Sequence, residues 1–335
     1  MGFRVEVLET GQVFEAEEGE SVLEAATRQE VALRHECTFG TCGTCRVKLV
    51  EGSVRYDEQP MALSPEEEAQ GFALMCQARV TSPLVISSAR VLPIVAEPSR
   101  HLAVVRDVRP LTREVLHLKL EIPGLAAAAW RPGQYMNVHL ADGSHRSFSM
   151  ASVPASGVID FHVRQIEGGR FTGAQLAGMR AGDALEIEFP LGPFGLHKAD
   201  YRPLLMVATG TGIAPIKSML ESLLDDEECP PVWLYWGMRT EADLYLDAVF
   251  RAWQGRLYEF EYAPVLSRAD VRWQGRRGHV QQAVLADLPD LSEHSIYLCG
   301  SPSMIDDAKA EFAARGAQLD HMHADAFTFQ QERSR

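Results

Sequence analysis

The sequence predicts several domains, in which an α+β unit and an antiparallel β-barrel precede a doubly wound α/β unit. The chain has 335 residues, which exceeds the length that one hydrophobic core usually serves. Two changes of pattern divide it, one at Pro93 and Pro98 and one at Pro203. Between them lie short runs typical of antiparallel strands, and afterwards apolar strands alternate with helices.

The first 92 residues predict a compact α+β domain. Residues 3–8 and 11–15 form an expected hairpin. Ser21 and Glu24 have the spacing of a capping box, so a short helix should begin there and end near residue 29. A strand is expected over residues 46–50, and the sequence Ser64-Pro65-Glu66-Glu67-Glu68 has the cap, proline and acidic first turn of a second helix.

Residues 93–101 are expected to be a linker. Residues 102–199 contain six runs that predict a closed antiparallel barrel, at 101–106, 115–121, 134–140, 146–151, 159–164 and 184–188, and a short helix at 172–177. Residues 200–335 predict a parallel sheet flanked by helices. Its strands are expected at 204–208, 232–236, 258–264 and 296–299, and its helices at 215–224, 240–253, 278–286 and 302–314.

Charge and hydropathy exclude some classes of function. A net charge of −14 argues against a nucleic-acid partner. The longest apolar runs are far shorter than the roughly 20 residues of a membrane span, and residues 1–11 lack a secretion signal, so a cytoplasmic protein is expected. Residues 1–92 hold eight Lys and Arg against fifteen Asp and Glu. This acidity indicates either a solvated surface or a docking face for a partner of opposite charge.

Four cysteines predict a metal cluster. Cys37, Cys42 and Cys45 have the spacing C-x4-C-x2-C, and Cys76 follows 31 positions later, which is typical of a plant-type [2Fe–2S] site. Gly40 and Gly43 let the backbone approach closely enough to point N–H groups at the sulfurs. A zinc site is the alternative, but zinc usually takes paired short hooks.

Three segments of the predicted barrel carry a further pattern. Arg146-Ser147-Phe148-Ser149 and His162-Val163-Arg164 each end a strand, and Gly168-Gly169-Arg170-Phe171-Thr172 opens the short helix. Taken alone, Arg146 would be a surface arginine. In this order the segments resemble the ferredoxin–NADP reductase superfamily, whose barrel carries an R-x-[YF]-S flavin motif. The resemblance implies that all three segments bind flavin, with arginine on phosphate and Ser149 near flavin N5. It implies FAD rather than FMN.

The α/β part continues the resemblance. Gly210-Thr211-Gly212 lies between a predicted strand and helix, where it would cradle a pyrophosphate, and Cys299-Gly300-Ser301 resembles the family's second nicotinamide motif. By the same resemblance, Asp325 lies near the flavin and Phe327 or Phe329 covers its ring. The structural alternatives are a core thiol at Cys299 and an ordinary C-terminal strand. Arg239 would admit the 2′-phosphate of NADPH, but Glu241 and Asp243 oppose that charge, which favours NADH.

The whole chain resembles the reductase components of bacterial aromatic-ring oxygenases. This resemblance implies a β-grasp ferredoxin domain, a flavin-binding barrel and a nicotinamide domain. Electrons would pass from NAD(P)H through FAD and the cluster to a terminal oxygenase or its ferredoxin. The reductase would be a monomer that binds this partner transiently. Ser149, Cys299 and Asp325 would be the catalytic residues. The alternatives are a deoxysugar-dehydrase reductase, a free-standing flavin or ferric reductase, and a redox sensor or zinc-bearing binding module.

Overall fold

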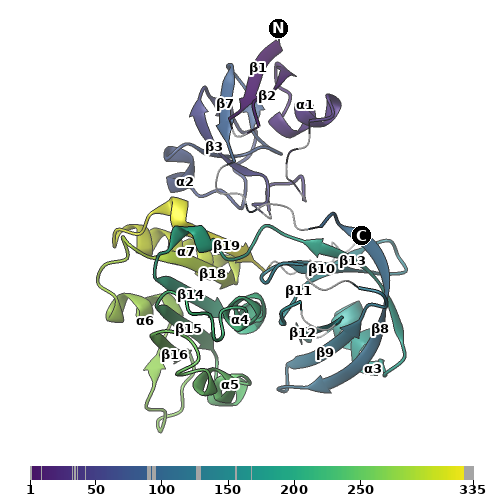
Figure 1. Cartoon of the computed structure of the whole chain (residues 1–335), viewed down its shortest axis with the longest axis vertical. Helices are drawn as coiled ribbons and strands as arrows, with labels where there is room; N and C mark the ends of the chain where they lie inside the picture. Colours follow the sequence, from purple (N-terminus) through teal and green to yellow (C-terminus); the bar gives the residue numbers. More distant parts are fainter. Residues whose placement is uncertain are drawn as a thin grey trace. The chain divides into compact units, whose positions relative to one another are not determined.

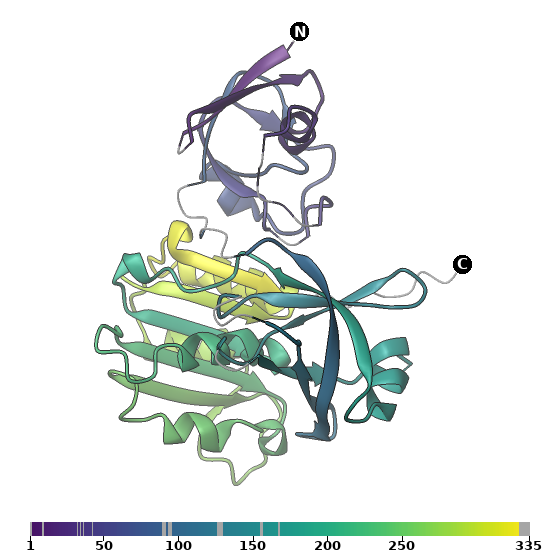
Figure 2. The same ribbon diagram turned by 45° about the vertical axis from the view of Figure 1, so that its right-hand side comes forward.

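The computed structural model describes residues 2–8, 10–31, 33, 35, 37–41, 43–88, 92, 96–125, 130–154, 157–166 and 168–327. The chain divides into two compact units, Met1–Val91 and Leu92–Arg335, and each is described by itself. Figure 1 labels their elements, and Figure 2 shows the same ribbon turned by 45°. Among the described helices, none is long and apolar enough to cross a lipid bilayer.

The smaller unit is a β-grasp fold with a mixed sheet of order β2-β1-β7-β3-β5. β1 pairs in parallel with β7, and the other neighbours are antiparallel. Val5 and Phe14 on the sheet and Ala25 on the helix are buried in its core. The elements are β1 (Gly2–Val7), β2 (Gln12–Glu17), α1 (Val22–Arg28), β3 (Arg46–Glu51), β4 (Val54–Arg55), α2 (Pro65–Ala69), β5 (Phe72–Leu74), β6 (Arg79–Val80) and β7 (Leu84–Ser87).

Both helices of this unit begin with a capping box, which the sequence predicts at Ser21 and Glu24, whereas at Ser64 it predicts the N-cap and the acidic first turn. At α2 the Ser64 hydroxyl accepts the Glu67 N–H, and the Glu67 carboxylate accepts the Ser64 N–H. Glu67 is fully buried and also pairs with Arg46. Because Arg46 directly follows Cys45, this ion pair holds the start of β3 next to the cysteine loop.

The first half of the larger unit is an antiparallel sheet of order β11-β10-β13-β8-β9-β12. Its outer strands meet at the bridge between Met150 and Phe161, so the sheet closes into the predicted barrel. The barrel core contains Val105, Leu118 and Met136, all fully buried. The elements are β8 (Ser99–Pro110), β9 (Val115–Glu121), β10 (Tyr135–His139), β11 (His145–Ser149), β12 (Val158–Arg164), η1 (Arg170–Gln175), α3 (Leu176–Gly178) and β13 (Ala184–Leu191).

The second half is a parallel sheet of order β17-β16-β15-β14-β18-β19. Figure 1 shows α4 and α5 on one side of it and α6 and α7 on the other. The chain order reverses between β14 and β18, which makes this position the topological switch point. The elements are η2 (Lys198–Asp200), β14 (Leu204–Thr209), η3 (Gly210–Gly212), α4 (Ile213–Glu221), β15 (Val232–Met238), η4 (Glu241–Asp243), α5 (Asp247–Ala252), β16 (Phe260–Leu266), β17 (Arg276–Arg277), α6 (Val280–Asp287), β18 (Ser295–Gly300), α7 (Pro302–Ala313), η5 (Leu319–His321) and β19 (Met322–Ala326).

Two predicted helices differ from the structure. The helix expected over residues 240–253 is a 3-10 turn followed by the shorter α5. Between them, Leu244 and Leu246 leave helical geometry, with ψ angles of 58° and 7°, and a turn here allows both leucine side chains to be buried. The helix expected at 172–177 begins as the π-helix η1. In addition, β8 begins at Ser99, so the last residues of the segment expected as a linker belong to a strand.

The Glu67→Ala variant tests the buried carboxylate of α2. We expect the free energy of unfolding of the smaller unit to fall by about 3 kcal/mol, because the change removes the capping box and the ion pair with Arg46. The free energy of unfolding is measured by urea titration of the whole protein, with the visible absorbance of the cysteine-loop site as the signal. Glu66→Ala, at an exposed position of the same helix, should change the value by less than about 0.5 kcal/mol. Equal effects of the two variants would contradict this account.

Candidate functional site

Three of the four predicted cluster cysteines lie among the described residues, and Cys42 lies outside them. Cys45 directly precedes β3 and Cys76 follows β5, and their sulfur atoms are 3.2 Å apart. In the preceding loop, Cys37 Sγ accepts the backbone N–H of Thr41 at 3.4 Å. Ligand sulfurs on one tetrahedral metal ion are about 4 Å apart, so Cys45 and Cys76 fit a shared iron.

The loop backbone wraps closely around this site. Gly40 has φ 75°, and a Cβ atom there would lie 2.9 Å from Cβ of Pro60. A hydrogen bond from the Cys45 thiol lowers the pKa of the Cys76 thiol, and a bond with the Gly40 backbone acts in the same direction, against burial. Both bonds favour the thiolate, which is the form that binds metal.

The predicted flavin motif lies on β11, at residues 146–149. Ser147 is exposed, whereas Ser149 is buried with 7% of its surface accessible. The ring of Phe148 lies 5.6 Å from the ring of Phe171 on η1. The structure therefore brings two of the three predicted flavin segments into contact, although they are far from adjacent in the sequence.

The glycine pair lies at the start of η1. Gly168 has φ 75° and Gly169 is the N-cap. A Cβ atom on Gly169 would lie 3.0 Å from the carbonyl oxygen of Ile166, and the buried Thr172 hydroxyl accepts the Ile166 N–H at 3.3 Å. This tight turn leaves no room for a side chain at Gly169, which suits a place where a phosphate meets backbone N–H groups.

The third predicted flavin segment ends β12 and reaches the parallel-sheet half. Val163 is fully buried in the barrel core. His162 is 8% exposed, and its Nδ1 lies 3.4 Å from the hydroxyl of Tyr245. The Arg164 guanidinium lies 3.2 Å from the carboxylate of Glu114. The side chains of His162 and Arg164 therefore have partners in other segments of the larger unit.

The predicted coenzyme segments meet at the switch point. A Cβ atom on Gly212 would overlap the carbonyl oxygen of Cys299, and one on Gly300 would overlap the Thr209 hydroxyl. The Ser301 N–H donates to that hydroxyl at 3.3 Å. The glycines thus allow the ends of β14 and β18 to touch, at the edge where dinucleotides bind in open parallel sheets. The predicted residues on this edge are Gly210, Thr211, Gly212, Gly300 and Ser301.

Cys299 is fully buried on β18, beside the predicted C-terminal residues. Its sulfur lies 3.9 Å from the carboxylate of Asp325. Burial, and then the charge of Asp325, raise the pKa of the Cys299 thiol well above its usual range. The Phe327 N–H donates to the Gly300 carbonyl at 2.7 Å, and Phe329 lies outside the described residues. The structure thus brings Cys299, Asp325 and Phe327 together.

Three family profiles match successive parts of the chain. Residues 5–81 match a 2Fe-2S iron-sulfur cluster binding domain, residues 103–195 an oxidoreductase FAD-binding domain, and residues 206–310 an oxidoreductase NAD-binding domain. Reductase component 1 of terephthalate 1,2-dioxygenase from Comamonas sp. is 33% identical over 98% of this chain and 98% of its own length. The chain belongs to the three-domain iron–sulfur flavoprotein reductases.

Other relatives of this reductase span nearly its whole length. The CDP-6-deoxy-L-threo-D-glycero-4-hexulose-3-dehydrase reductase of Yersinia pestis is 31% identical, covering 98% of this chain and 99% of its own. The phenol 2-monooxygenase reductase component of Pseudomonas sp. strain CF600 is 36% identical, covering 92% and 89%. The crystal structure of the Amycolatopsis cytochrome P450 reductase GcoB matches with a TM-score of 0.73 at 31% identity, covering 98% and 99%.

The predictions of enzyme class and cofactors are confirmed. The chain is an NAD(P)H-dependent oxidoreductase with a [2Fe–2S] cluster and FAD as its cofactors. The residues described above fit these groups: adjacent thiols for the cluster, a glycine turn for a phosphate and a close glycine contact for the dinucleotide.

Sequence patterns did not indicate the side chains that join the two halves of the larger unit. The Ser218 hydroxyl accepts the Gly133 N–H at 3.0 Å, and Lys217 donates to the Ala151 carbonyl at 2.8 Å. Both side chains lie on α4, which begins at the coenzyme turn. Their only signal in the sequence is that two polar residues interrupt an otherwise apolar stretch of this helix.

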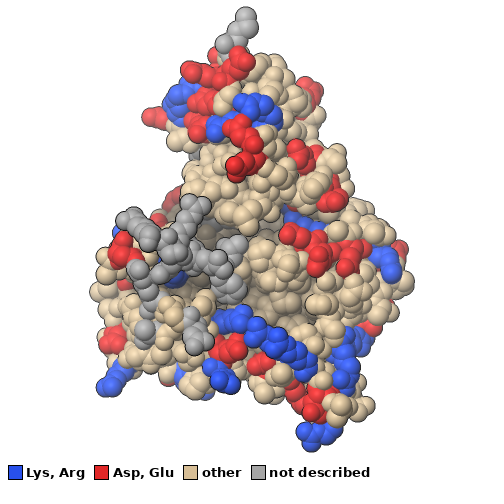
Figure 3. Space-filling model, turned by 180° about the vertical axis from the view of Figure 1, so that it is seen from behind, with Lys and Arg blue, Asp and Glu red and all other residues tan. Residues whose placement is uncertain are grey.

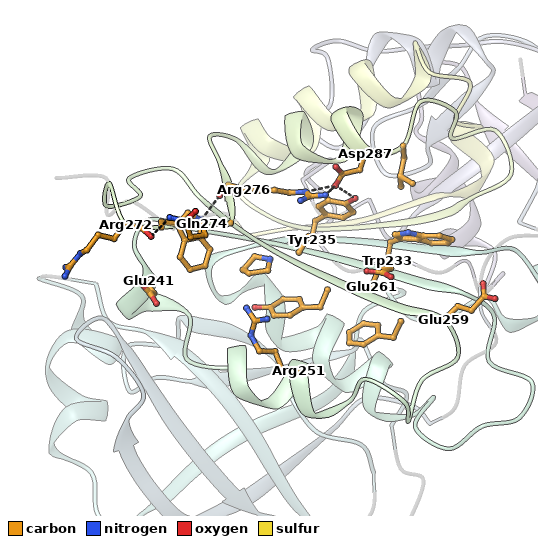
Figure 4. Close-up of a pocket in the computed structure, with 17 residues that line it drawn as sticks. Trp233, Tyr235, Glu241, Arg251, Glu259, Glu261, Arg272, Gln274, Arg276 and Asp287 are labelled. Carbon is orange, nitrogen blue, oxygen red and sulfur yellow. Dashed lines mark hydrogen bonds and ion pairs between the residues drawn. The ribbon is translucent and has the colours of Figure 1, made fainter.

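A groove of about 1020 Å³ runs along β16, and Figure 4 shows the side chains that line it. None of the predicted coenzyme residues is among them. The Tyr235 hydroxyl donates to Asp287 at 2.6 Å, and the same carboxylate accepts Arg276 Nε at 2.6 Å. Asp287 therefore binds both Tyr235 and Arg276 in this groove, and the coenzyme edge lies elsewhere on the sheet.

Figure 3 shows acidic and basic side chains interspersed on the visible face of the smaller unit. Two ion pairs of this unit join Arg28 to Glu20 at 2.8 Å and Arg79 to Glu24 at 2.7 Å. Part of the acidity of residues 1–92 is therefore used in local ion pairs. An acidic docking face remains a prediction.

The burial of His162 predicts a pH-dependent stability. Burial, followed by the charges of Lys217 and His117, lowers the pKa of His162 from 6.5 to about 3. Between these pH values the unfolded chain binds a proton that the folded chain does not, so stability falls as the pH drops below 6.5. We expect His162 to lower the free energy of unfolding by about 2 kcal/mol when the pH falls from 7 to 5.

Urea unfolding of the parent and of His162→Gln at both pH values measures this effect. The variant should lose less stability between pH 7 and pH 5 than the parent, by the amount just given. If both proteins lost the same amount, the pH dependence would arise from other groups.

The Gly212→Ala variant tests the close contact at the switch point. Gly212 has φ −57°, which alanine adopts without strain, so the change acts through overlap with Cys299. We expect kcat/KM for NADH oxidation with ferricyanide to fall about tenfold or more, which corresponds to about 1.4 kcal/mol, while FAD stays bound. In the control variant Gly178→Ala, the added Cβ has no atom within 4 Å. This variant should keep the parent kcat/KM and the bound FAD. A fully active Gly212→Ala protein would contradict the assignment.

Proposed function

We propose that this reductase carries electrons from NADH through FAD and its cluster to the terminal oxygenase of a multicomponent oxygenase, or to its ferredoxin. The adjacent thiols of Cys45 and Cys76 carry the proposal, because a chain that only reduced free flavin would have no use for them. Bound FAD supplies the conversion of one two-electron transfer into single-electron transfers. The relatives that serve terephthalate dioxygenase and phenol monooxygenase support this acceptor.

The cluster ligands in this proposal are Cys37, Cys42, Cys45 and Cys76. Residues 146–149, 162–164 and 168–172 would hold the flavin, with Arg146 pairing with its phosphates and Ser149 next to N5. Contacts between these segments and the buried position of Ser149 support this arrangement.

The coenzyme pyrophosphate lies against the turn at Gly210–Gly212 and against Gly300 and Ser301. Cys299 and Ser149 would line the hydride path between nicotinamide and flavin, with Asp325 beside Cys299, and Phe327 would cover the flavin ring when nicotinamide is absent. Because the Cys299 thiol stays protonated, it contributes shape and contact rather than a base.

The ferredoxin domain comprises residues 1–92, the flavin barrel begins with β8 at Ser99 and ends at residue 199, and the nicotinamide domain comprises residues 200–335. The reductase acts as a monomer that meets its acceptor transiently. We place it in the cytoplasm, where cysteines remain reduced.

A second acceptor, a dehydrase that removes a hydroxyl group from a nucleotide-linked sugar, is supported by the Yersinia pestis relative. To distinguish the two acceptors, the protein is reduced with NADH under anaerobic conditions and then mixed, in separate experiments, with each purified partner. Faster reoxidation of the cluster by an aromatic-ring oxygenase supports the first acceptor, and faster reoxidation by the dehydrase overturns it.

The Cys76→Ala variant tests the order of electron flow. We expect it to lose the [2Fe–2S] absorbance and at least about 90% of cytochrome c reduction, because one electron at a time leaves through the cluster. Flavin bleaching by NADH should continue at the parent rate. Cys229→Ala, which removes a buried thiol of the parallel-sheet half, should keep the cluster. Cytochrome c reduction at the parent rate in Cys76→Ala would show that electrons leave from the flavin.

A further inference from the structure

Glu114 occupies a well-defined place on the flavin barrel. It lies in the turn between β8 and β9, directly before Val115. Its N–H donates to the Thr112 hydroxyl at 3.2 Å, and its carbonyl accepts the Gln165 N–H at 2.8 Å. These two bonds fix the backbone on both sides of the residue, so its side chain projects from a fixed point.

The carboxylate of Glu114 lies between two arginines from different halves of the larger unit. One oxygen lies 3.2 Å from Arg164 Nη2, at the end of β12. The other lies 3.5 Å from Arg239 Nη1, in the turn after β15. All three side chains are between a third and a half exposed, so a bound ligand can reach them.

Arg239 occupies the position that distinguishes the two nicotinamide coenzymes in folds of this type. It directly follows β15, which is the neighbour of β14 on the side away from the switch point. With the pyrophosphate at the β14 turn, the adenosine ribose would lie over the end of this neighbouring strand. There an arginine accommodates a 2′-phosphate, whereas an acidic side chain accepts a hydrogen bond from a 2′-hydroxyl.

The acids close to Arg239 in the sequence have other roles. Asp243 accepts the backbone N–H of Thr240 at 2.9 Å and its hydroxyl at 2.8 Å, so it caps its own turn. Glu241 lines the groove along β16 (Figure 4). The acid that contacts Arg239 is Glu114, which is 125 residues away and comes from the flavin barrel.

We propose that Glu114 is a specificity-determining residue that makes this reductase prefer NADH to NADPH, acting across the boundary between the flavin barrel and the nicotinamide domain. The proposal rests on the proposed function, since it concerns the coenzyme that reduces the flavin. The carboxylate holds one edge of Arg239 and places a negative charge where a 2′-phosphate would lie. A phosphate monoester carries about −1.5 to −2 charges at neutral pH, so repulsion affects NADPH and not the 2′-hydroxyl of NADH.

The Glu114→Gln variant tests the proposal. Loss of this charge should raise kcat/KM for NADPH about five- to tenfold, as expected for a partly exposed charge close to a phosphate. The value for NADH should change less than about threefold. Both are measured from the rate of flavin bleaching, at low and at high salt, and the gain for NADPH should shrink at high salt.

Two further variants separate specificity from a structural effect. In Glu114→Gln combined with Arg239→Ala, the gain for NADPH should be clearly smaller than in Glu114→Gln alone, because the repulsion is relieved but no released guanidinium is left to pair with the phosphate. Glu186→Gln removes the partner of Arg100 in another exposed ion pair of the barrel and should leave the NADPH/NADH ratio unchanged. The FAD content of each variant shows whether loss of the contact with Arg164 has disturbed the flavin.

Several results would overturn the proposal. A parent protein that prefers NADPH would do so, and so would equal changes for both coenzymes in Glu114→Gln, or a gain that is equally large after removal of Arg239. These failures differ from failure of the proposed function, in which neither coenzyme would bleach the flavin of the parent protein.

Discussion

A buried hydrogen bond between the Gly133 N–H and the Ser218 hydroxyl ties helix α4 to the flavin barrel, and both ligand sites of the larger unit depend on it. Gly133 has φ 103°, and a Cβ atom there would lie 2.6 Å from the carbonyl oxygen of Phe194. Because α4 begins at the coenzyme turn, its contact with the barrel sets the separation of the two sites. Hydride transfer requires reacting atoms within roughly 3.5 Å, so small displacements here are costly.

The sequence predicted features that depend on a few neighbouring residues. The capping box at Ser21 and the N-cap at Ser64 depend on residues within one helical turn, and the strand expected at 115–121 coincides with β9. Contacts between distant segments could not be predicted from the sequence. Tyr245 falls in a predicted helix, but its contact with His162 is found where a turn interrupts that helix. No local pattern encodes such a partner.

The cluster site shows why one spacing was predictable and another was not. Within the loop, the intervals between Cys37, Cys42 and Cys45 are set by how the backbone wraps a small cluster. Cys76 arrives by another route, since β3 and β5 pair antiparallel with Arg46 opposite Leu74. Antiparallel pairing places the residue before one strand and the residues after the other at the same end. The spacing of 31 positions between Cys45 and Cys76 is therefore set by the segment that connects β3 to β5. The length of this segment is free as long as β5 pairs with β3.

The buried thiol of Cys299 has a consequence for the durability of the enzyme. Oxidants attack thiolates that solvent can reach, and the ladder from sulfenic to sulfonic acid begins with that step. Cys299 is fully buried and stays protonated, whereas Cys37 is partly exposed in its loop. Oxidative damage therefore reaches the cluster loop before it reaches the coenzyme edge. An ageing molecule would lose its one-electron outlet first, while it could still oxidise NADH.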